Sequence, residues 1–107
     1  MLFRSKVYII QSIDRKMALE DIASAKGLDL EDLLSEIEAI VSTGTRLDIN
    51  YYIEENLDEE VVEEIYDWFK EEAASDSLDD ALAALGSDYE DLEIRLVRIK
   101  FLCEVAN

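Results

Sequence analysis

Residues 18–41, ALEDIASAKGLDLEDLLSEIEAIV, have the spacing of two short helices joined by a tight turn. Gly27 comes four residues after Ala23, where the turn can use the positive φ angle that glycine tolerates. Leu33 and Ile37 follow on one face of the second helix, as two closely packed helices require. We therefore predict a helix-turn-helix, with helices at about residues 18–26 and 30–43. The residues expected to shape it are Ile22, Ala23, Gly27, Leu28, Leu33 and Ile37.

The predicted second helix carries the wrong charge for a helix that reads DNA. A helix that enters the major groove normally brings Arg, Lys, Asn or Gln to phosphates and base edges. Between Lys26 and Arg46 the sequence has no basic residue. The acidic residues of this stretch are Asp29, Glu31, Asp32, Glu36 and Glu38. The same spacing also fits a packed helical corner that makes no contact with DNA, and both interpretations stay open.

The composition predicts an all-α protein. The 107 residues include no proline and only three glycines, and 50% of them are hydrophobic. We expect a compact bundle of six or seven helices around one core, in a single domain that spans residues 1–107. No apolar run approaches the about 20 residues that cross a membrane, and no signal peptide opens the chain. We therefore expect a cytoplasmic protein that makes no membrane contact.

Apolar spacing predicts five more helices, at about residues 4–15, 48–56, 59–74, 77–86 and 87–105. A buried strand remains an alternative for the first of them. Asp29 is placed to cap the second helix of the helix-turn-helix, and capping boxes are predicted for Ser77 with Asp80 and for Ser87 with Glu90. The final helix is expected to pack through Leu92, Leu96, Ile99, Leu102, Cys103, Val105 and Ala106.

The net charge of −17 is unevenly distributed, because both basic groups lie near the chain ends. Residues 17–94 hold 25 of the 27 acidic residues and would repel a polyanion. Arg95 could pair with Asp91 within the final helix, or it could contact phosphate or a partner. The candidate nucleic-acid-binding residues are Arg95, Arg98, Lys100, Arg4, Lys6, Arg15 and Lys16.

The residue types and spacings of this sequence indicate neither catalysis nor metal binding. The sequence has no histidine, which is the commonest general base and zinc ligand, and Cys103 is its one cysteine. The acidic run at 58–64 lacks the alternating ligands and central glycine of a calcium loop. We expect no catalytic residue and no metal site in this chain. The aromatic side chains lie among acids, so we expect them to pack in the core rather than to stack on bases.

Two stretches of the sequence resemble a known family. They are KMALEDIASAKGLDLEDLLSEIEAIVSTGTRLDINYYI and, after an acidic helix, SLDDALAALGSDYEDLEIRLVRIKF. Their shared pattern is Ile-Ala-x-x-x-Gly-Leu at 22–28, apolar anchors at 33 and 37, Gly-x-x-Leu-Asp-Ile at 44–49 and Tyr-x-x-x-x-Ile-Arg-Leu at 89–96. In this order they resemble the helicase-associated helix-turn-helix domain at the C-terminal end of RecQ-type ATP-dependent DNA helicases. The resemblance covers about residues 16–104 and is closest to the Bacteroidetes version.

The resemblance implies a non-catalytic accessory domain that helps a helicase to engage DNA during repair and recombination. It also implies that the chain is a fragment, with Met1 internal and with the ATP, magnesium and zinc sites upstream in the parent enzyme. An alternative is an acidic protein-interaction or autoinhibitory module that docks on a basic surface of the helicase or of a repair partner. A third possibility, an acidic antirepressor or DNA mimic, requires Met1 to be a true start.

Overall fold

The computed structural model describes residues 2–73, 75 and 77–106, with side chains from residue 6 to residue 105 apart from 74 and 76. These residues form seven α-helices and two π-helical turns, and no strand occurs among them. The helices are α1 (Leu2–Asp14), α2 (Leu19–Lys26), α3 (Leu30–Ser42), α4 (Asn50–Asn56), α5 (Glu59–Asp67), α6 (Leu78–Leu85) and α7 (Asp91–Phe101). The predicted all-α class is confirmed, and the strand alternative for the first segment is wrong.

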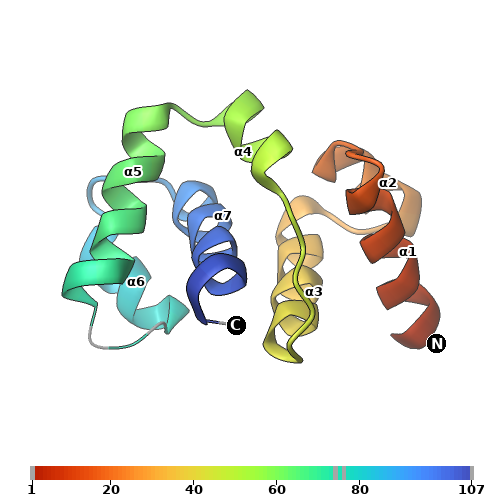
Figure 1. Ribbon diagram of the computed structural model, residues 1–107. Coiled ribbons are helices and arrows are strands. Elements are labelled where there is room, and N and C mark those ends of the chain that lie inside the picture. Colours follow the sequence, from red (N-terminus) through yellow and green to blue (C-terminus); the bar gives the residue numbers. More distant parts are fainter. Residues whose placement is uncertain (1, 74, 76, 107) are drawn as a thin grey trace.

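The helices fall into two groups (Figure 1). One group consists of α1, α2 and α3, and the other of α5, α6 and α7, while α4 lies between them. The helix predicted at 59–74 begins at Glu59, but it changes to a π-helical turn at Trp68–Glu72. The predicted final helix is likewise divided, into α7 and a π-helical turn at Leu102–Ala106.

The helix-turn-helix consists of α2 and α3 and has the predicted boundaries to within one residue. Ile22, Leu33 and Ile37 are completely buried between the two helices and their neighbours. Gly27 ends α2 with a left-handed φ of 71°, as the spacing predicts. The Asp29 carboxylate accepts a hydrogen bond from the Asp32 amide at 2.8 Å and so caps α3.

Replacing Gly27 with alanine is expected to lower the free energy of unfolding by roughly 1–2 kcal/mol, because an L-residue is strained at this φ. An added Cβ would meet no atom within 4 Å, so the expected cost is purely conformational. Urea unfolding of Gly27→Ala measures it, with Ser24→Ala as the control because Ser24 is exposed on α2. A Gly27→Ala variant as stable as the control would contradict the assignment of this turn.

The corner between α6 and α7 differs from the prediction. Ser77 caps α6, since its hydroxyl accepts from the Asp80 amide, but the predicted capping box is only half formed. The Ser77 amide and the Asp80 carboxylate both bind the Ser75 hydroxyl instead of each other. The second predicted box, Ser87 with Glu90, is wrong. The box forms instead between Glu90 and Glu93, which accept hydrogen bonds from each other's backbone amides. The N-cap lies three residues later than predicted, at Glu90, because residues 86–88 form a turn.

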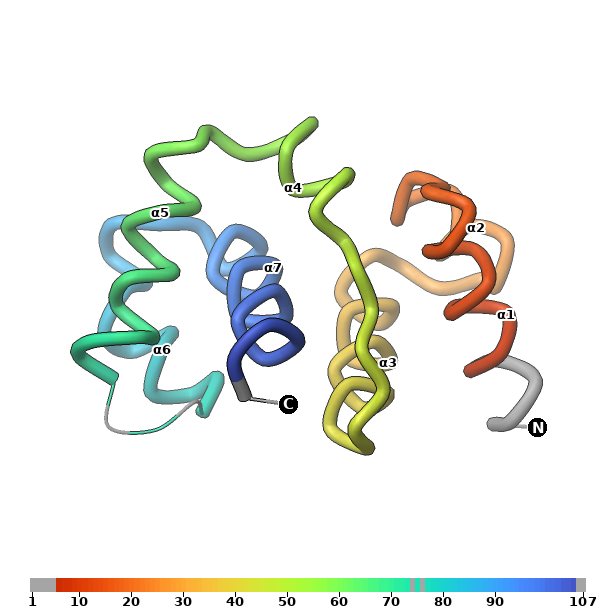
Figure 2. The backbone as a smooth tube through the Cα atoms, in the orientation of Figure 1, coloured from red at the N-terminus to blue at the C-terminus, as the bar shows by residue number. Residues whose placement is uncertain are grey.

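The hydrophobic core is divided into two clusters that share α7. Leu96, Ile99 and Cys103 lie in the first cluster, together with the buried faces of α1 to α4. Ile94 and Val97 lie in the second cluster, together with α5 and α6. Figure 2 shows the backbone of α7 running between α3 on one side and α5 and α6 on the other. The final helix therefore contributes buried residues to both clusters.

This position explains why the predicted packing face of the final helix is only partly correct. Leu96, Ile99 and Cys103 are buried as expected. Val105 is 55% exposed, so its predicted burial is wrong, and the Ala106 side chain lies outside the described residues. The prediction also missed the second buried side, which consists of Ile94, Val97 and Phe101. A helix that packs on two sides does not show a single apolar stripe.

Candidate functional site

Arg95 on α7 binds α3 and does not pair with Asp91 as predicted. Its Nε and Nη2 atoms donate to the two carboxylate oxygens of Glu38, at 3.2 and 2.8 Å. Nη2 also donates to the Ser35 hydroxyl at 3.1 Å. The side chains of Arg95 and Glu38 are only 14% and 16% exposed. Two-point contact between a guanidinium and a carboxylate is a strong ion-pair geometry, so this pair fastens α7 to α3.

The other two candidate cations of α7 also have partners. Arg98 places Nη1 3.8 Å from Glu38 Oε2. Lys100 donates to Asn50 Oδ1 at 2.8 Å and to Glu104 Oε2 at 2.9 Å. Burial raises the pKa of Glu104, but hydrogen bonds from Lys100, Tyr66 and Asn50 outweigh it and hold that pKa below its ordinary value. These cations therefore join α7 to its neighbours.

The N-terminal candidates lie in a different part of the molecule. Lys6 is partly buried, and its Nζ donates to the Thr43 hydroxyl at 3.5 Å. Arg15 and Lys16 are exposed in the turn after α1, where Lys16 has a φ of 62°. The Arg4 side chain lies outside the described residues. The seven candidates are thus distributed over α1, the turn that follows it and α7, and the described residues do not form one basic patch.

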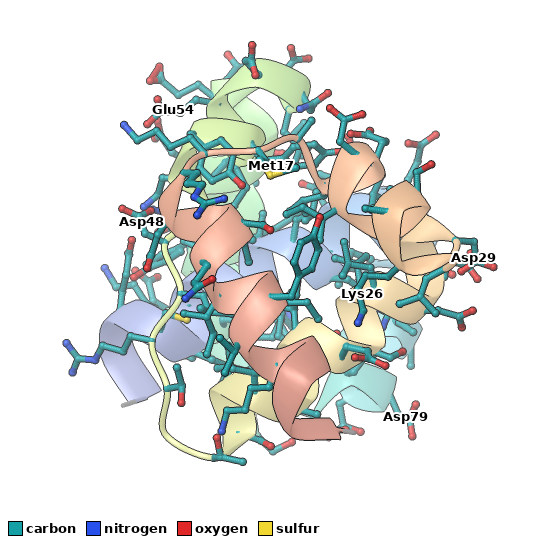
Figure 3. All side chains as sticks on the ribbon, turned by 90° about the vertical axis from the view of Figure 1, so that its right-hand side faces the viewer. Met17, Lys26, Asp29, Asp48, Glu54 and Asp79 are labelled. Atoms are coloured by element: carbon teal, nitrogen blue, oxygen red, sulfur yellow. The ribbon has the colours of Figure 1, made fainter. Side chains whose placement is uncertain are left out.

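The exposed side of α3 is acidic. Asp32 is exposed and Glu36 is partly exposed, and neither forms an ion pair within the described residues. The view in Figure 3 shows carboxylates pointing outward elsewhere too, among them those of Asp29, Glu54 and Asp79. A phosphate backbone would meet negative charge along this face.

A known family model matches the helix-turn-helix and the segments that flank it. Residues 4–53 match the family model described as RecQ-1-like, helix-turn-helix domain. The matched segment is slightly less than half of the chain, and it is similar to that domain. The match begins within α1 and ends within α4, so residues 54–107 lie outside it. No curated protein matches the chain.

A domain of this type is non-catalytic. Among the residues that the structure describes, no group of three or more His, Cys, Asp and Glu side chains could hold a metal ion. The Cys103 thiol is buried and accepts a hydrogen bond from the Leu47 amide at 3.4 Å. Burial raises the pKa of this thiol, which makes it a poor nucleophile. No helix in the described part of the chain is long and apolar enough to cross a membrane.

Tyrosine hydroxyls form four further hydrogen bonds, two within residues 17–52 and two within residues 64–104. The four bonds are Tyr51 to the Met17 carbonyl oxygen (2.5 Å), Tyr52 to Glu20, Tyr66 to Glu104 (2.9 Å) and Tyr89 to Glu64 (2.5 Å). Tyr52 and Phe69 are buried in the core, while Tyr51, Tyr66 and Trp68 are partly buried against it. The predicted packing role of these rings is confirmed.

From these hydroxyls we predict that the folded protein loses stability at high pH. Burial raises the pKa of Tyr51 from 10.0 to about 12, and burial together with the bond to Glu104 does the same for Tyr66. The hydrogen bond to Glu64 raises the pKa of Tyr89 to about 12. Because the folded pKa lies above the unfolded one, the stabilisation is complete below pH 10 and is lost as pH rises towards about 12.

Tyrosinate absorbance and helical ellipticity, followed together during an alkaline titration, measure this effect. We expect ionisation and loss of ellipticity to occur together above pH 10. Substituting phenylalanine for Tyr66 provides a matched comparison, since it keeps the ring and removes one titrating hydroxyl. Ionisation of all the tyrosines near pH 10 with the helices intact would contradict the hydrogen bonds described above.

Proposed function

We propose that this chain is a non-catalytic accessory domain of a RecQ-type ATP-dependent DNA helicase and that it acts through contact with protein. In this proposal its acidic surface docks on a basic surface of the helicase or of a repair partner. The observation that carries the proposal is the pairing of Glu38 with Arg95 and Arg98. This pairing turns two candidate DNA-binding cations into links between α3 and α7.

The charge distribution supports the same proposal. An acidic helix-turn-helix is repelled by phosphate but is attracted to a basic protein surface at long range. The chain has a formal net charge of −17, and the exposed acids of α5 extend the acidic surface beyond α3. The exposed acids of α5 are Glu59, Glu60, Glu63, Glu64 and Asp67.

In this proposal the domain regulates how the helicase unwinds DNA during repair and recombination. A basic surface of a helicase that tracks DNA is also the surface on which an acidic domain can compete with DNA. The parent enzyme would bind ATP, magnesium and zinc outside this chain and would work on DNA in the cytoplasm. The domain would set how readily that enzyme engages a fork.

A second function, direct engagement of DNA, is favoured by Arg15 and Lys16. Both are exposed and adjacent, in the turn between α1 and α2. Phosphate contacts from such residues would position an enzyme without reading sequence. The two functions differ in what they predict for binding of DNA by this chain alone.

The experiment adds the 107-residue chain to the parent helicase from which this segment has been removed. Fluorescence anisotropy of labelled forked DNA then reports binding by the helicase. We expect the chain to displace DNA at low salt and to do so less at high salt. A chain with Glu59, Glu60 and Glu63 replaced by glutamine is expected to displace less. No displacement by the wild-type chain, even at low salt, would overturn the proposal.

A further inference from the structure

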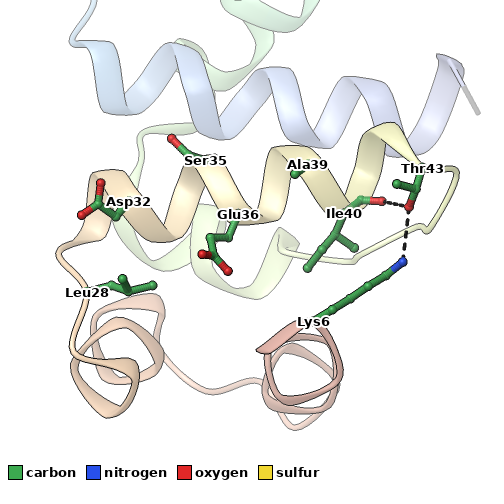
Figure 4. Close-up of a pocket in the computed structure, with 8 residues that line it drawn as sticks. All are labelled: Lys6, Leu28, Asp32, Ser35, Glu36, Ala39, Ile40 and Thr43. Carbon is green, nitrogen blue, oxygen red and sulfur yellow. Dashed lines mark hydrogen bonds between the residues drawn. The ribbon is translucent and has the colours of Figure 1, made fainter. Parts of the chain in front are cut away.

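A shallow groove runs along the exposed side of α3, next to α1 and the turn that follows α2 (Figure 4). Its volume is about 600 Å³. Five of its lining residues recur along α3 at intervals of three or four positions, so they form one continuous stripe. The groove is lined by Lys6, Leu28, Asp32, Ser35, Glu36, Ala39, Ile40 and Thr43.

The middle of the groove is apolar. Ile40 is 5% exposed and belongs to the first core cluster, and Leu28 packs against the same cluster. Ala39 is exposed beside them, and its single methyl group leaves open the space that a longer side chain would fill. The groove is thus a place where an incoming apolar side chain can lose contact with water.

The two ends of the groove carry opposite charge. Asp32 and Glu36 are one helical turn apart on one wall, and both lack an ion-pair partner within the described residues. Lys6 lies at the other end, where its ammonium is bound to Thr43 (Figure 4). A ligand that enters alongside Asp32 and Glu36 therefore needs a positive charge there.

We propose that this groove binds a short amphipathic helix of a protein partner, with aliphatic side chains on one face and lysine or arginine beside them. The aliphatic side chains would contact Leu28, Ala39 and Ile40, and the basic ones would pair with Asp32 and Glu36. From Asp32 to its end at Ser42 the helix α3 rises about 15 Å, which matches about three turns of an incoming helix. The inference deepens the proposed function and rests on it, since it locates the docking on α3.

The test uses a synthetic probe of defined chemistry. The probe is a 15-residue peptide of leucine and lysine, with the leucines spaced to share one helical face. A second peptide of the same composition, with the leucines distributed around the helix, serves as its control. Titration of each peptide into the isotopically labelled 107-residue chain is followed by two-dimensional NMR. We expect the first peptide to shift the amide signals of Leu28, Ala39 and Ile40 and to bind about tenfold more tightly than the second.

Two variants test the site itself. Ala39→Gln fills the groove without changing charge and is expected to weaken binding of the first peptide by about tenfold. Ala84→Gln is the matched control, because Ala84 is exposed on α6, away from the groove. Asp32→Asn with Glu36→Gln is expected to weaken binding, whereas Glu31→Gln is expected to have a smaller effect because Glu31 does not line the groove. Circular dichroism checks that each variant is folded.

Three results would overturn the inference. The two peptides could bind equally, Ala39→Gln could bind as well as wild type, or the wild-type chain could self-associate through this face in sedimentation experiments. The proposed function has a separate readout, namely displacement of DNA by the added chain. Equal displacement by wild type and Ala39→Gln would overturn the groove as the docking site and leave the proposed function intact.

Discussion

Replacing Leu96 with alanine is expected to lower the free energy of unfolding by about 2–5 kcal/mol, the usual cost of a leucine deleted from a closed core. Leu96 is completely buried and lies on the side of α7 that completes the cluster of α1 to α4. The opposite side of the same helix holds Ile94 in the second cluster. Loosening α7 should therefore weaken both clusters at once.

Urea unfolding and amide hydrogen exchange test this expectation. Val7→Ala is the control, because it is also an apolar truncation but at a side chain that is 45% exposed on α1. Its expected effect is about 0.5 kcal/mol or less. We expect Leu96→Ala to lose exchange protection in α3 and α5 together. If protection falls in α3 alone, α7 does not couple the two clusters.

Replacing Arg95 with methionine is expected to lower the free energy of unfolding by about 1–3 kcal/mol. The methionine keeps much of the aliphatic length but removes both hydrogen bonds to Glu38. The Glu38 carboxylate, 16% exposed, would then keep Arg98 at 3.8 Å as its ion-pair partner. Leaving a partly buried carboxylate without its closest donor lowers the free energy of unfolding by more than the intact ion pair raises it.

A double-mutant cycle separates the pair from its surroundings. Glu38→Met combined with Arg95→Met is expected to recover part of the lost stability, because the partly buried carboxylate that lost the Arg95 hydrogen bonds is then also removed. Arg15→Met is the control, since it removes an exposed arginine with the same chemistry. Thermal unfolding measures the wild type, the two single variants, the double variant and the Arg15→Met control. Additive effects of the two substitutions would mean that Arg95 and Glu38 do not interact.

The helix-turn-helix was predictable because its determinants are local. Gly27, the cap at Asp29 and the apolar anchors lie within about 20 residues of one another, and spacing alone orders them. The role of α7 was not predictable in this way. Its two buried sides face partners far away in the sequence, and a helix with apolar residues on two sides lacks the clear stripe that marks one packing face.

The candidate site likewise has features that were predictable from local sequence and features that depend on distant residues. The sequence identified Arg95, Arg98 and Lys100 as the basic residues of the final helix and offered Asp91 as an acid near Arg95. The acid that binds Arg95 is Glu38, which precedes it by 57 residues on another helix. The acidic charge of the second helix was evident from the sequence. That one of its acids pairs with two of the candidate cations follows only from how α3 and α7 pack.

The most direct test of a domain that acts through protein is whether the chain binds DNA by itself. The 107-residue chain is titrated against labelled forked and single-stranded DNA by fluorescence anisotropy, at low and then at physiological salt. Our account predicts no binding at physiological salt and none tighter than the about 10⁻⁴–10⁻⁶ M of non-specific contacts at low salt. Tighter, salt-sensitive binding that is lost when Arg15 and Lys16 are replaced by glutamate would contradict it and establish direct engagement of DNA.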